Sequence, residues 1–360
     1  MSKWLDKYLS GIKKLLPEKS SESSVGLDIG VDSCKMVEIV KSGNSFELIN
    51  WAIEPIVNND KKAVIKRIMS KLKNPSRAPF TGVFGKGTLI RYIDMPKMSI
   101  EDLRKSLSFE SDKYFPFAKD QIYTDCYIQG TNERENKVSV LVAAAKKEII
   151  DERVRLLIDL GLQSEFIGVN PIALANVFHS LGHCDQSQKE AVTGKVDPSA
   201  ALAVLDMGET VSNLMILQNN MPRFTRDIYI GGKELSQRIS NALGVSLEEA
   251  ERIKRNPAGK KEEILNTSES SLLNLIAEIR LSFDYFTTEH NCHITKMFLT
   301  GGSSMLEGII EFFNKNLEIT AEKWDPLACL KLSSAVPLSA VKNDAGRLGV
   351  ALGLALYQYR

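Results

Sequence analysis

Two short phrases of the sequence each combine an aspartate with a glycine turn at the end of an apolar strand. The first contains Asp28 and Gly30, and the second, about halfway along the chain, contains Asp206 and Gly208. Backbone N–H groups in a glycine turn can approach phosphate oxygens closely, and carboxylates bind divalent cations such as Mg²⁺. The repeated phrase therefore predicts two similar halves that face each other across a polyphosphate and a metal ion.

Small polar residues extend this predicted site. Ser33 and Thr210 follow the two turns, where their hydroxyls can donate to phosphate oxygens. A third phrase, Gly301-Gly302-Ser303, follows another predicted strand. Glycines without Cβ atoms let a flat base lie against the backbone, and the helix after them points its amino end at the site.

The apolar pattern predicts the elements that must position these residues. The first half opens with three strands, a helix and a fourth strand, at 25–29, 35–41, 46–53, 60–72 and 81–85. Residues 89–161 then read as strand, helix, strand, strand and helix, which we interpret as a small α+β insert. A polar segment at 187–198 predicts a hinge. The second half has strands at 200–205, 213–218 and 296–300 around an almost wholly helical stretch from 231 to 288.

Length and composition limit the class of protein. The chain has 360 residues, more than the roughly 100–200 of one ordinary domain, so two lobes are expected. It carries 46 basic and 45 acidic residues, and this balance disfavours a nucleic-acid partner. Five cysteines without a C-x-x-C pair favour a reducing compartment. The apolar runs are far shorter than the roughly 20 residues of a membrane-spanning helix, which predicts a soluble cytoplasmic protein.

The first 24 residues form a separate unit. Apolar residues recur at helical spacing over 3–16, with lysines mostly between them, which predicts one basic amphipathic helix. Pro17 ends it, and the polar residues up to Ser24 predict a flexible linker. Such a helix can lie in a membrane surface, dock on a partner or pack on the body of its own chain.

Further phrases occur in the order found in a known family. They are Gly26-Leu27-Asp28-Ile29-Gly30 with Ser33 and Lys35, Asp94-Met95-Pro96, Glu110 with Tyr114-Phe115-Pro116-Phe117, Asp206-Met207-Gly208, Phe224-Thr225-Arg226-Asp227-Ile228, Ile230-Gly231-Gly232, Glu249-Ala250-Glu251 with Lys254, and Thr300-Gly301-Gly302. With this ordered set the sequence resembles the PilM family of type IV pilus assembly proteins, in the FtsA-like branch of the actin-like ATPase superfamily. The resemblance covers nearly all of the chain after residue 24 and does not explain the residues before it.

The resemblance implies a fold and a division of the chain. The fold is α/β and actin-like, with two lobes of duplicated ribonuclease-H-like domains and an FtsA-type α+β insert, or SHS2 domain, in the first lobe. The implied units are the amphipathic helix and linker at 1–24, a first lobe at 25–88 with 162–195 and about 337–360, the insert at 89–161, and a second lobe at 196–336 whose helical subdomain spans about 233–295.

The resemblance also implies ATP and Mg²⁺ as ligands. Asp28 and Asp206 would hold Mg²⁺ mostly through water, which suits an ion that dehydrates reluctantly. Lys35 would neutralise phosphate charge. Glu251 and Lys254 share a helix face and would reach the ribose and purine, or form an ordinary surface ion pair. The implied nucleotide site comprises Asp28, Gly30, Ser33, Lys35, Asp206, Gly208, Thr210, Gly232, Glu251, Lys254, Gly301, Gly302 and Ser303.

One residue beside the second turn departs from the family pattern. Glu209 stands where many relatives have a small residue, and its carboxylate would repel the terminal phosphate, order metal or water, or point into solvent. Spacing alone identifies no hydrolytic base. The sequence therefore predicts ATP binding as a conformational clamp, with slow or absent hydrolysis.

The insert implies a second function. In the family, the cytoplasmic N-terminal tail of a PilN-like inner-membrane protein docks as an extended peptide in a groove beside it, a form of short-peptide capture. Candidate groove residues are Arg91, Met95, Tyr114, Phe115, Phe117 and Tyr123, and all of them except Arg91 fit a core position equally well. Arg91 and Arg104 could pair with acidic groups of such a peptide.

We therefore expect an ATP-binding scaffold of type IV pilus assembly, or of the related type II secretion machinery, at the cytoplasmic face of the inner membrane. Contacts with other pilus-assembly proteins, and with the membrane surface through residues 3–16, belong to this expectation. Two alternatives share the fold. One is a filament-forming actin homologue of the FtsA type, anchored by the N-terminal helix. The other is a sugar kinase, which needs a general-base aspartate that no phrase supplies.

Overall fold

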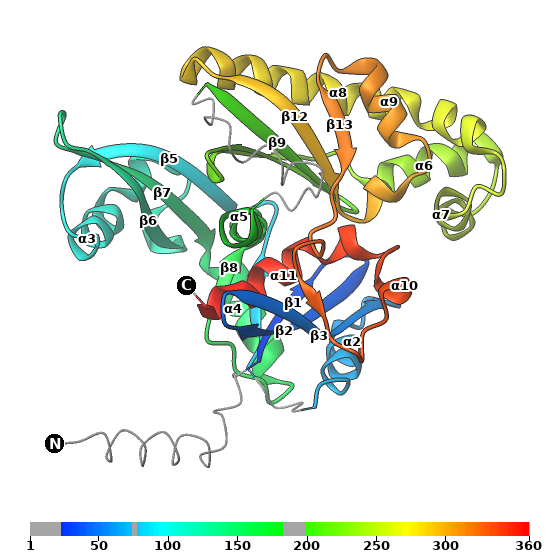
Figure 1. The fold of residues 1–360 in the computed structure, drawn as a ribbon, viewed down its shortest axis with the longest axis horizontal. Helices are drawn as coiled ribbons and strands as arrows, with labels where there is room; N and C mark the ends of the chain where they lie inside the picture. The colour runs from blue at the N-terminus through cyan, green and yellow to red at the C-terminus, as the bar shows by residue number, and fades with distance from the viewer. Residues whose placement is uncertain (1–22, 74–77, 183–198, 360) are drawn as a thin grey trace, which may run out of the picture.

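The computed structural model describes residues 23–73, 78–182 and 199–359. The predicted helix at 3–16 and the predicted hinge at 187–198 lie outside these residues. Three sheets organise the described chain (Figure 1): one at the bottom of the view, one at the top, and a smaller one on the left. No helix in the described ranges is both long enough and apolar enough to cross a membrane.

The sheet of the first lobe has six strands in the order β14-β3-β2-β1-β4-β8. Their bounds are Ser24–Ile29 (β1), Ser33–Ser42 (β2), Ser45–Pro55 (β3), Phe80–Val83 (β4), Ile167–Val169 (β8) and Lys331–Leu332 (β14). The helix α2 (Lys61–Met69) packs on this sheet, and its N-cap Asp60 accepts a hydrogen bond from the Ala63 N–H. Because β14 already pairs with β3, the chain returns to the first lobe before the predicted boundary near residue 337.

The sheet of the second lobe has five strands in the order β11-β10-β9-β12-β13. Their bounds are Ala200–Met207 (β9), Ser212–Gln218 (β10), Met221–Ile228 (β11), His293–Thr300 (β12) and Thr320–Lys323 (β13). The helices of this lobe are α6 (Gly232–Leu243), α7 (Leu247–Arg255), α8 (Lys261–His290) and α9 (Ile309–Asn316). The helical stretch predicted from 231 to 288 is therefore three helices, α6 to α8.

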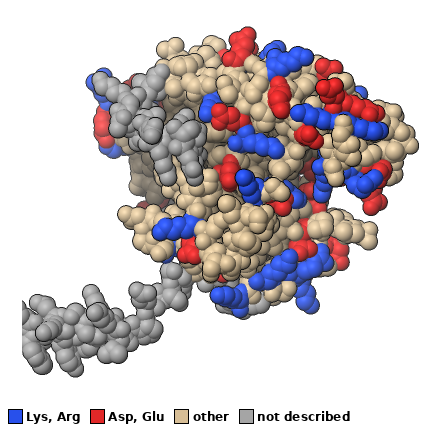
Figure 2. Space-filling model, turned by 45° about the vertical axis from the view of Figure 1, so that its right-hand side comes forward, with Lys and Arg blue, Asp and Glu red and all other residues tan. Residues whose placement is uncertain are grey.

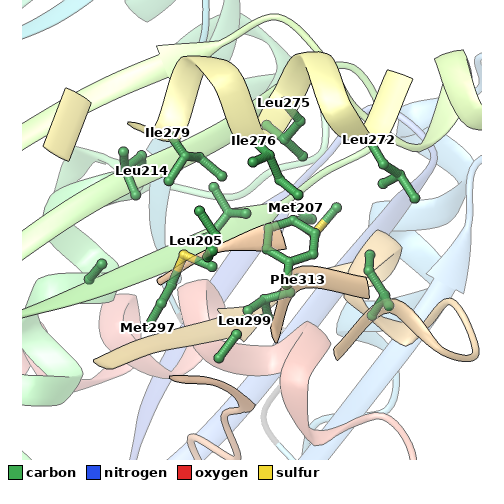
Figure 3. Close-up of a cluster of buried hydrophobic side chains, with 14 of the residues drawn as sticks. Leu205, Met207, Leu214, Leu272, Leu275, Ile276, Ile279, Met297, Leu299 and Phe313 are labelled. Carbon is green, nitrogen blue, oxygen red and sulfur yellow. The ribbon is translucent and has the colours of Figure 1, made fainter. Parts of the chain in front are cut away.

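The core of the second lobe follows from the helical period of α8. Its residues Leu272, Leu275, Ile276 and Ile279 are spaced three and four apart, so they share one face of the helix. Figure 3 shows these side chains above Leu205, Met207 and Leu299 of the sheet, with Phe313 of α9 beside them. All are nearly fully buried. This packed face fixes the five-stranded sheet on which the second aspartate turn is mounted.

The two large sheets share one local topology. In the first, β1 pairs antiparallel with β2 and parallel with β4; in the second, β9 pairs antiparallel with β10 and parallel with β12. The strand orders β3-β2-β1-β4 and β11-β10-β9-β12 therefore repeat each other. This repetition confirms the two similar halves predicted from the aspartate phrases.

The insert contains the predicted sequence of strand, helix, strand, strand and helix. Its elements are β5 (Thr88–Pro96), α3 (Ile100–Glu110), β6 (Ile122–Asn132), β7 (Lys137–Lys146) and α4 (Lys147–Ile158), and its sheet has the order β5-β7-β6. Leu103 and Leu107 of α3 are fully buried against Val140 and Val142 of β7. The insert thus has a small core of its own.

Two further helices lie between the lobes. Figure 1 shows α5 (Asn170–Leu181) and α11 (Gly349–Ala355) near the centre of the molecule, while the short α10 (Leu338–Val341) lies at the right of the first lobe. Phe178 of α5 stacks on Trp324 with ring centroids 4.3 Å apart, in a core cluster that joins residues from both large sheets. The two lobes therefore share buried contacts through α5.

Charged side chains of both signs are interspersed on the surface. Figure 2 shows Lys and Arg next to Asp and Glu over the upper part of one face. This distribution agrees with the balance of 46 basic and 45 acidic residues.

Candidate nucleotide-binding site

The two aspartate phrases form the same turn. The Gly30 N–H donates to the Ser33 carbonyl oxygen at 3.0 Å, and the Gly208 N–H donates to the Val211 carbonyl oxygen at 3.1 Å. A Cβ atom at either glycine would lie 2.9 or 2.7 Å from that same oxygen, so any larger residue would open the turn. These two N–H groups are consequently occupied within their turns. The two glycines themselves therefore shape the turns.

The residues opposite the two aspartates differ. Lys35 stands opposite Asp28 in the β1–β2 register, with Nζ 3.4 Å from Oδ2 of Asp28. Asn213 stands opposite Asp206 in the β9–β10 register, and its Nδ2 donates instead to Oδ1 of Asp227 at 2.6 Å. A cation therefore stands opposite the first aspartate in the neighbouring strand, and an amide stands opposite the second.

The carboxyl group of Asp206 is less acidic than that of an ordinary aspartate. Burial raises the pKa of Asp206 to about 6, the negative charge of Asp28 adds to this rise, and Lys35 opposes it. Asp28 and Asp206 both line one cavity. In the described part of the chain, no three His, Cys, Asp or Glu side chains are grouped as a metal site. Two carboxylates that line one cavity fit a hydrated Mg²⁺ better than an ion bound only by protein ligands.

The glycine phrase after β12 closes against the second turn. Gly301 has φ 85°, and a Cβ atom there would lie 2.4 Å from Oδ1 of Asp206. The Ser303 hydroxyl donates to the Gly208 carbonyl oxygen at 2.9 Å, and the Gly232 N–H donates to that oxygen at the same distance. Three phrases that are far apart in the sequence therefore meet around Gly208.

Lys254 and Glu251 lie at the wall of the same cavity. The Lys254 Nζ is 2.5 Å from Oε2 of Glu251 and donates to the Gly232 carbonyl oxygen at 2.9 Å. Lys254 is only 6% exposed, so the alternative of a solvated surface pair is not what the structure shows. Burial acts to raise the pKa of Glu251, but Lys254 and hydrogen bonds from Ser236 and Arg255 bring it below its ordinary value.

These residues line one cavity of about 280 Å³ between the lobes. Every residue of the predicted nucleotide site lines it except Gly232, which lies directly behind Ser303 and Lys254. A Cβ atom at Gly232 would lie 2.3 Å from the Ser303 Oγ and 3.0 Å from the Lys254 Nζ. The absence of a side chain at Gly232 therefore leaves room for the side chains of Ser303 and Lys254.

Glu209 turns toward this cavity. Its residue lines the cavity, and its Oε2 would lie 3.2 Å from a Cβ atom at Gly232. Burial raises the pKa of Glu209, while Lys254 opposes the rise and Glu251 adds to it. Of the roles left open by the sequence, solvent exposure is the one this position does not fit.

Sequence reasoning missed several residues of the cavity. Asn170 begins α5, and its Nδ2 donates to Oδ1 of Asp28 at 3.3 Å. Arg255 of α7 extends across the cavity mouth, with Nη2 3.6 Å from Oδ2 of Asp32. The Asn170-Pro171 pair does signal a helix start, and Asp32 adjoins the first turn, but no spacing in the sequence places Arg255 opposite Asp32.

The predicted partner-groove residues do not line one groove. Met95 and Phe115 are 5% and 2% exposed in the core of the insert, so the structure corrects their assignment to a groove. Tyr114 and Phe117 pack partly buried against that core, while Arg91 and Tyr123 are exposed.

An apolar groove lies on another side of the insert. It has a volume of about 220 Å³ and is bounded by β6, β8, α5 and the end of α11. Of the residues proposed from the sequence for peptide contacts, Arg104 lines it, at its Asp125 end, where the Arg104 Nε is 2.9 Å from Oδ1 of Asp125. Tyr127 and Gln129 of β6 line it as well, and the sequence did not single them out.

Comparison with known proteins agrees with this architecture. The family model described as type IV pilus assembly protein PilM matches residues 26–359. The solved structure of a PilM-PilN type IV pilus biogenesis complex superposes with a TM-score of 0.80 at 23% identity, over 94% of this chain and 99% of that one. The ethanolamine utilization protein EutJ from Carboxydothermus hydrogenoformans has a TM-score of 0.51 at 15% identity, over 98% of both chains. The predicted actin-like fold is confirmed, and the chain belongs to the PilM family of type IV pilus assembly proteins.

Proposed function

We propose that this protein is an ATP-binding scaffold of pilus assembly, in which the cavity between the lobes takes Mg²⁺ and ATP. The observation that carries the proposal is the convergence of the duplicated aspartate turns and the Gly301 phrase on one cavity. Asp28 and Asp206 would hold the hydrated metal ion, which neutralises phosphate charge when it is bound. Lys35 would add a cation beside the phosphates, and Lys254 and Glu251 would lie near the ribose and base.

The charges of the cavity favour binding over rapid hydrolysis. Glu209 brings a further carboxylate to the wall beside Gly232, in the cavity that the two aspartates also line. A third carboxylate near the phosphates would disfavour the additional negative charge of an attacking hydroxide. We therefore propose a nucleotide-dependent clamp. Rapid phosphate release by the purified protein alone would contradict this version.

Calorimetric titration of the full chain with ATP and Mg²⁺ tests the site. We expect binding by the wild type and at least a tenfold loss of affinity in Asp28→Ala and Asp206→Ala, because each removes a carboxylate from the metal ion. Asp159→Ala is the control, since Asp159 is the exposed C-cap residue of α4, does not line the cavity and pairs with Lys62. Equal affinity in all four proteins would remove this cavity from consideration.

The Asp32–Arg255 pair predicts an effect on nucleotide release. It joins the first-lobe turn to α7 of the second lobe across the cavity mouth, and an exposed pair of this kind contributes about 0.2–1 kcal/mol. We expect Arg255→Gln to release a fluorescent ATP analogue about two- to fivefold faster in stopped-flow experiments. Arg252→Gln is matched to it, because Arg252 lies on the same helix and pairs only with Glu249 among the described ion pairs. Identical rates for the two variants would show that the cross-lobe pair has no such role.

We also propose that the apolar groove beside the insert binds the cytoplasmic N-terminal tail of a PilN-like inner-membrane protein. The solved relative is a PilM-PilN complex. The groove supports this assignment because β6 and β8 are edge strands of their sheets, so an extended peptide there would find unpaired backbone groups. Such a partner would hold the protein at the cytoplasmic face of the inner membrane.

Two tyrosines of β6 provide a matched test of the groove. Tyr127 lines the groove and Tyr123 does not, although they are 49% and 48% exposed. We expect Tyr127→Ala to weaken binding of a labelled partner-tail peptide by about tenfold or more, as for an aromatic contact at the centre of an interface. Tyr123→Ala should bind like the wild type. The reverse result would favour the surface first predicted from the sequence.

A further inference from the structure

One helix lines both cavities. The first residues of α5, Asn170 and Leu174, line the nucleotide cavity. Residues on its other side, Ile172 and Asn176, line the apolar groove. The helix is twelve residues long, or about three turns. The two sites therefore lie on different sides of one short helix.

A second helix repeats this arrangement. Gly349 and Val350, at the start of α11, line the nucleotide cavity. Leu354 at its end lines the groove, as does Tyr357 in the single 3₁₀ turn that follows. Both α5 and α11 therefore extend from one cavity to the other.

The two helices are in backbone contact. A Cβ atom at Gly353 of α11 would lie 1.7 Å from the Ala173 carbonyl oxygen of α5, so only glycine allows this approach. Asn176 of α5 also donates from Nδ2 to the Gly353 carbonyl oxygen at 3.4 Å. Helices packed this closely shift together, because interiors are too dense to deform gradually.

Beside the nucleotide cavity, the packed helices α5 and α11 are attached to the first aspartate turn. Asn170 bonds Asp28, and Gly82 leaves room for the Asn170 side chain, since a Cβ atom at Gly82 would lie 2.2 Å from Oδ1 of Asn170. Arg153 of α4 donates from Nη1 to the Gly82 carbonyl oxygen at 2.7 Å and to Oγ1 of Thr81 at 2.9 Å. Because α4 directly follows β7, the insert is tied to the backbone behind the aspartate.

At the groove end, a buried acceptor is left without a partner. Asn176 is 1% exposed, and its Oδ1 makes no hydrogen bond within the described residues. A buried polar atom in this position costs free energy until a donor reaches it. A ligand that supplies a donor to the groove would therefore act directly on the side chain that connects α5 to α11.

We propose that the α5–α11 pair couples the two cavities, so that occupation of the nucleotide cavity changes the groove and a groove ligand changes nucleotide affinity by the same factor. The coupling rests on the proposed function, since it requires a nucleotide in the first cavity. It assigns a regulatory role to Gly353 and Asn176, which lie outside the nucleotide cavity. The ligand class of the groove is a short extended peptide with a hydrogen-bond donor near Asn176.

Hydrogen–deuterium exchange of the full chain, with and without saturating Mg²⁺ and ATP, tests the coupling. Residues 125–129 of β6 report on the groove alone, because β6 contributes nothing to the nucleotide cavity. We expect their exchange rates to change by about fivefold or more, a typical size for coupling between sites. Residues 300–304 report on nucleotide binding, and α2, which lines neither cavity, reports on any general stabilisation.

Two variants should break the coupling without removing the nucleotide. In Gly353→Ala the new Cβ forces the helices apart, and in Asn176→Ala the side chain between them is lost. We expect both to keep the response at 300–304 and to lose that at 125–129. Gly130→Ala is the matched control, since a Cβ atom there meets nothing within 4 Å. If Gly353→Ala does not fold, Asn176→Ala decides.

The outcomes separate this proposal from the one on which it rests. A response at 300–304 with none at 125–129 in the wild type overturns the coupling and leaves nucleotide binding intact. A response at 125–129 that survives in both variants overturns the role of the helix pair. No response at either place overturns nucleotide binding and, with it, the coupling.

Discussion

Replacing Asp206 with asparagine is expected to stabilise the ligand-free protein at neutral pH and to abolish its stabilisation by Mg²⁺ and ATP. Burial raises the pKa of Asp206 to about 6, so the ionised carboxylate is held in an unfavourable environment. A neutral amide of similar shape avoids this cost. The same substitution removes one of the two carboxylates proposed for the metal ion.

The stabilising effect has a definite pH dependence. The ordinary pKa of an aspartate is 3.8 and the folded pKa of Asp206 is about 6, so the native state binds more protons than the unfolded state between these values. Stability consequently falls as the pH rises through this window, by up to about 3 kcal/mol at roughly 1.4 kcal/mol per pKa unit. Because Asp206 borders an open cavity, we expect the loss of stability across this pH window to be about 1–3 kcal/mol. The gain in folding stability from Asp206→Asn should reach its full size above pH 6 and should vanish near pH 4.

Thermal unfolding at pH 7.5 and at pH 4.5, with and without the ligands, measures both effects. Asp284→Asn is the control, since Asp284 is exposed on α8 and neither stability nor ligand response should change. A variant with lower stability than the wild type at neutral pH would show that Asp206 makes a favourable contact in the ligand-free state. A preserved response to Mg²⁺ and ATP would exclude Asp206 from the metal site.

Removing the buried ammonium of Lys254 is expected to destabilise the folded protein. Lys254→Met removes the ammonium that pairs with Glu251 and donates to the Gly232 carbonyl oxygen inside the cavity wall. Glu251 keeps its bonds from Ser236 and Arg255, and the Gly232 oxygen keeps a bond from Ser236. Breaking one side of a buried ion pair typically costs about 3–5 kcal/mol, because the remaining charge stays buried. Because Glu251 keeps two partners, we expect a loss at the lower end of this range, on the order of 3 kcal/mol, in urea unfolding.

A double variant separates lost pairing from lost packing. In Lys254→Met/Glu251→Gln no unpaired charge remains, so much of the stability should return. Arg252→Gln is the control on the same helix, because Arg252 is 76% exposed and its pair with Glu249 contributes about 0–1 kcal/mol. If the double variant were no more stable than Lys254→Met, packing of the lysine stem would account for the loss.

Much of the nucleotide cavity could be predicted because its residues lie in short phrases at the ends of strands. Asp28, Asp206 and Gly301 each follow a strong apolar run, and the parallel pairing of β9 with β12 brings Asp206 and Gly301 to one edge. The role of Gly232 emerged differently: its conformation is ordinary, and only the structure shows Ser303 and Lys254 where a Cβ would be.

The groove could not be predicted in the same way, because it depends on the packing of units far apart in the sequence. Met95 and Phe115 read as surface candidates because apolar residues near a turn suit a groove and a core equally. Tyr127 gave no signal, since the pattern of β6 does not say which of its residues faces α5.

The difference between the residues opposite the two aspartates, Lys35 opposite Asp28 and Asn213 opposite Asp206, has a calorimetric consequence. Near pH 6 the free protein carries a fraction of a proton on Asp206 that a metal ion would displace. Binding would then release protons to the buffer. The measured heat near pH 6 should change with the ionisation enthalpy of the buffer, and at pH 8 it should not.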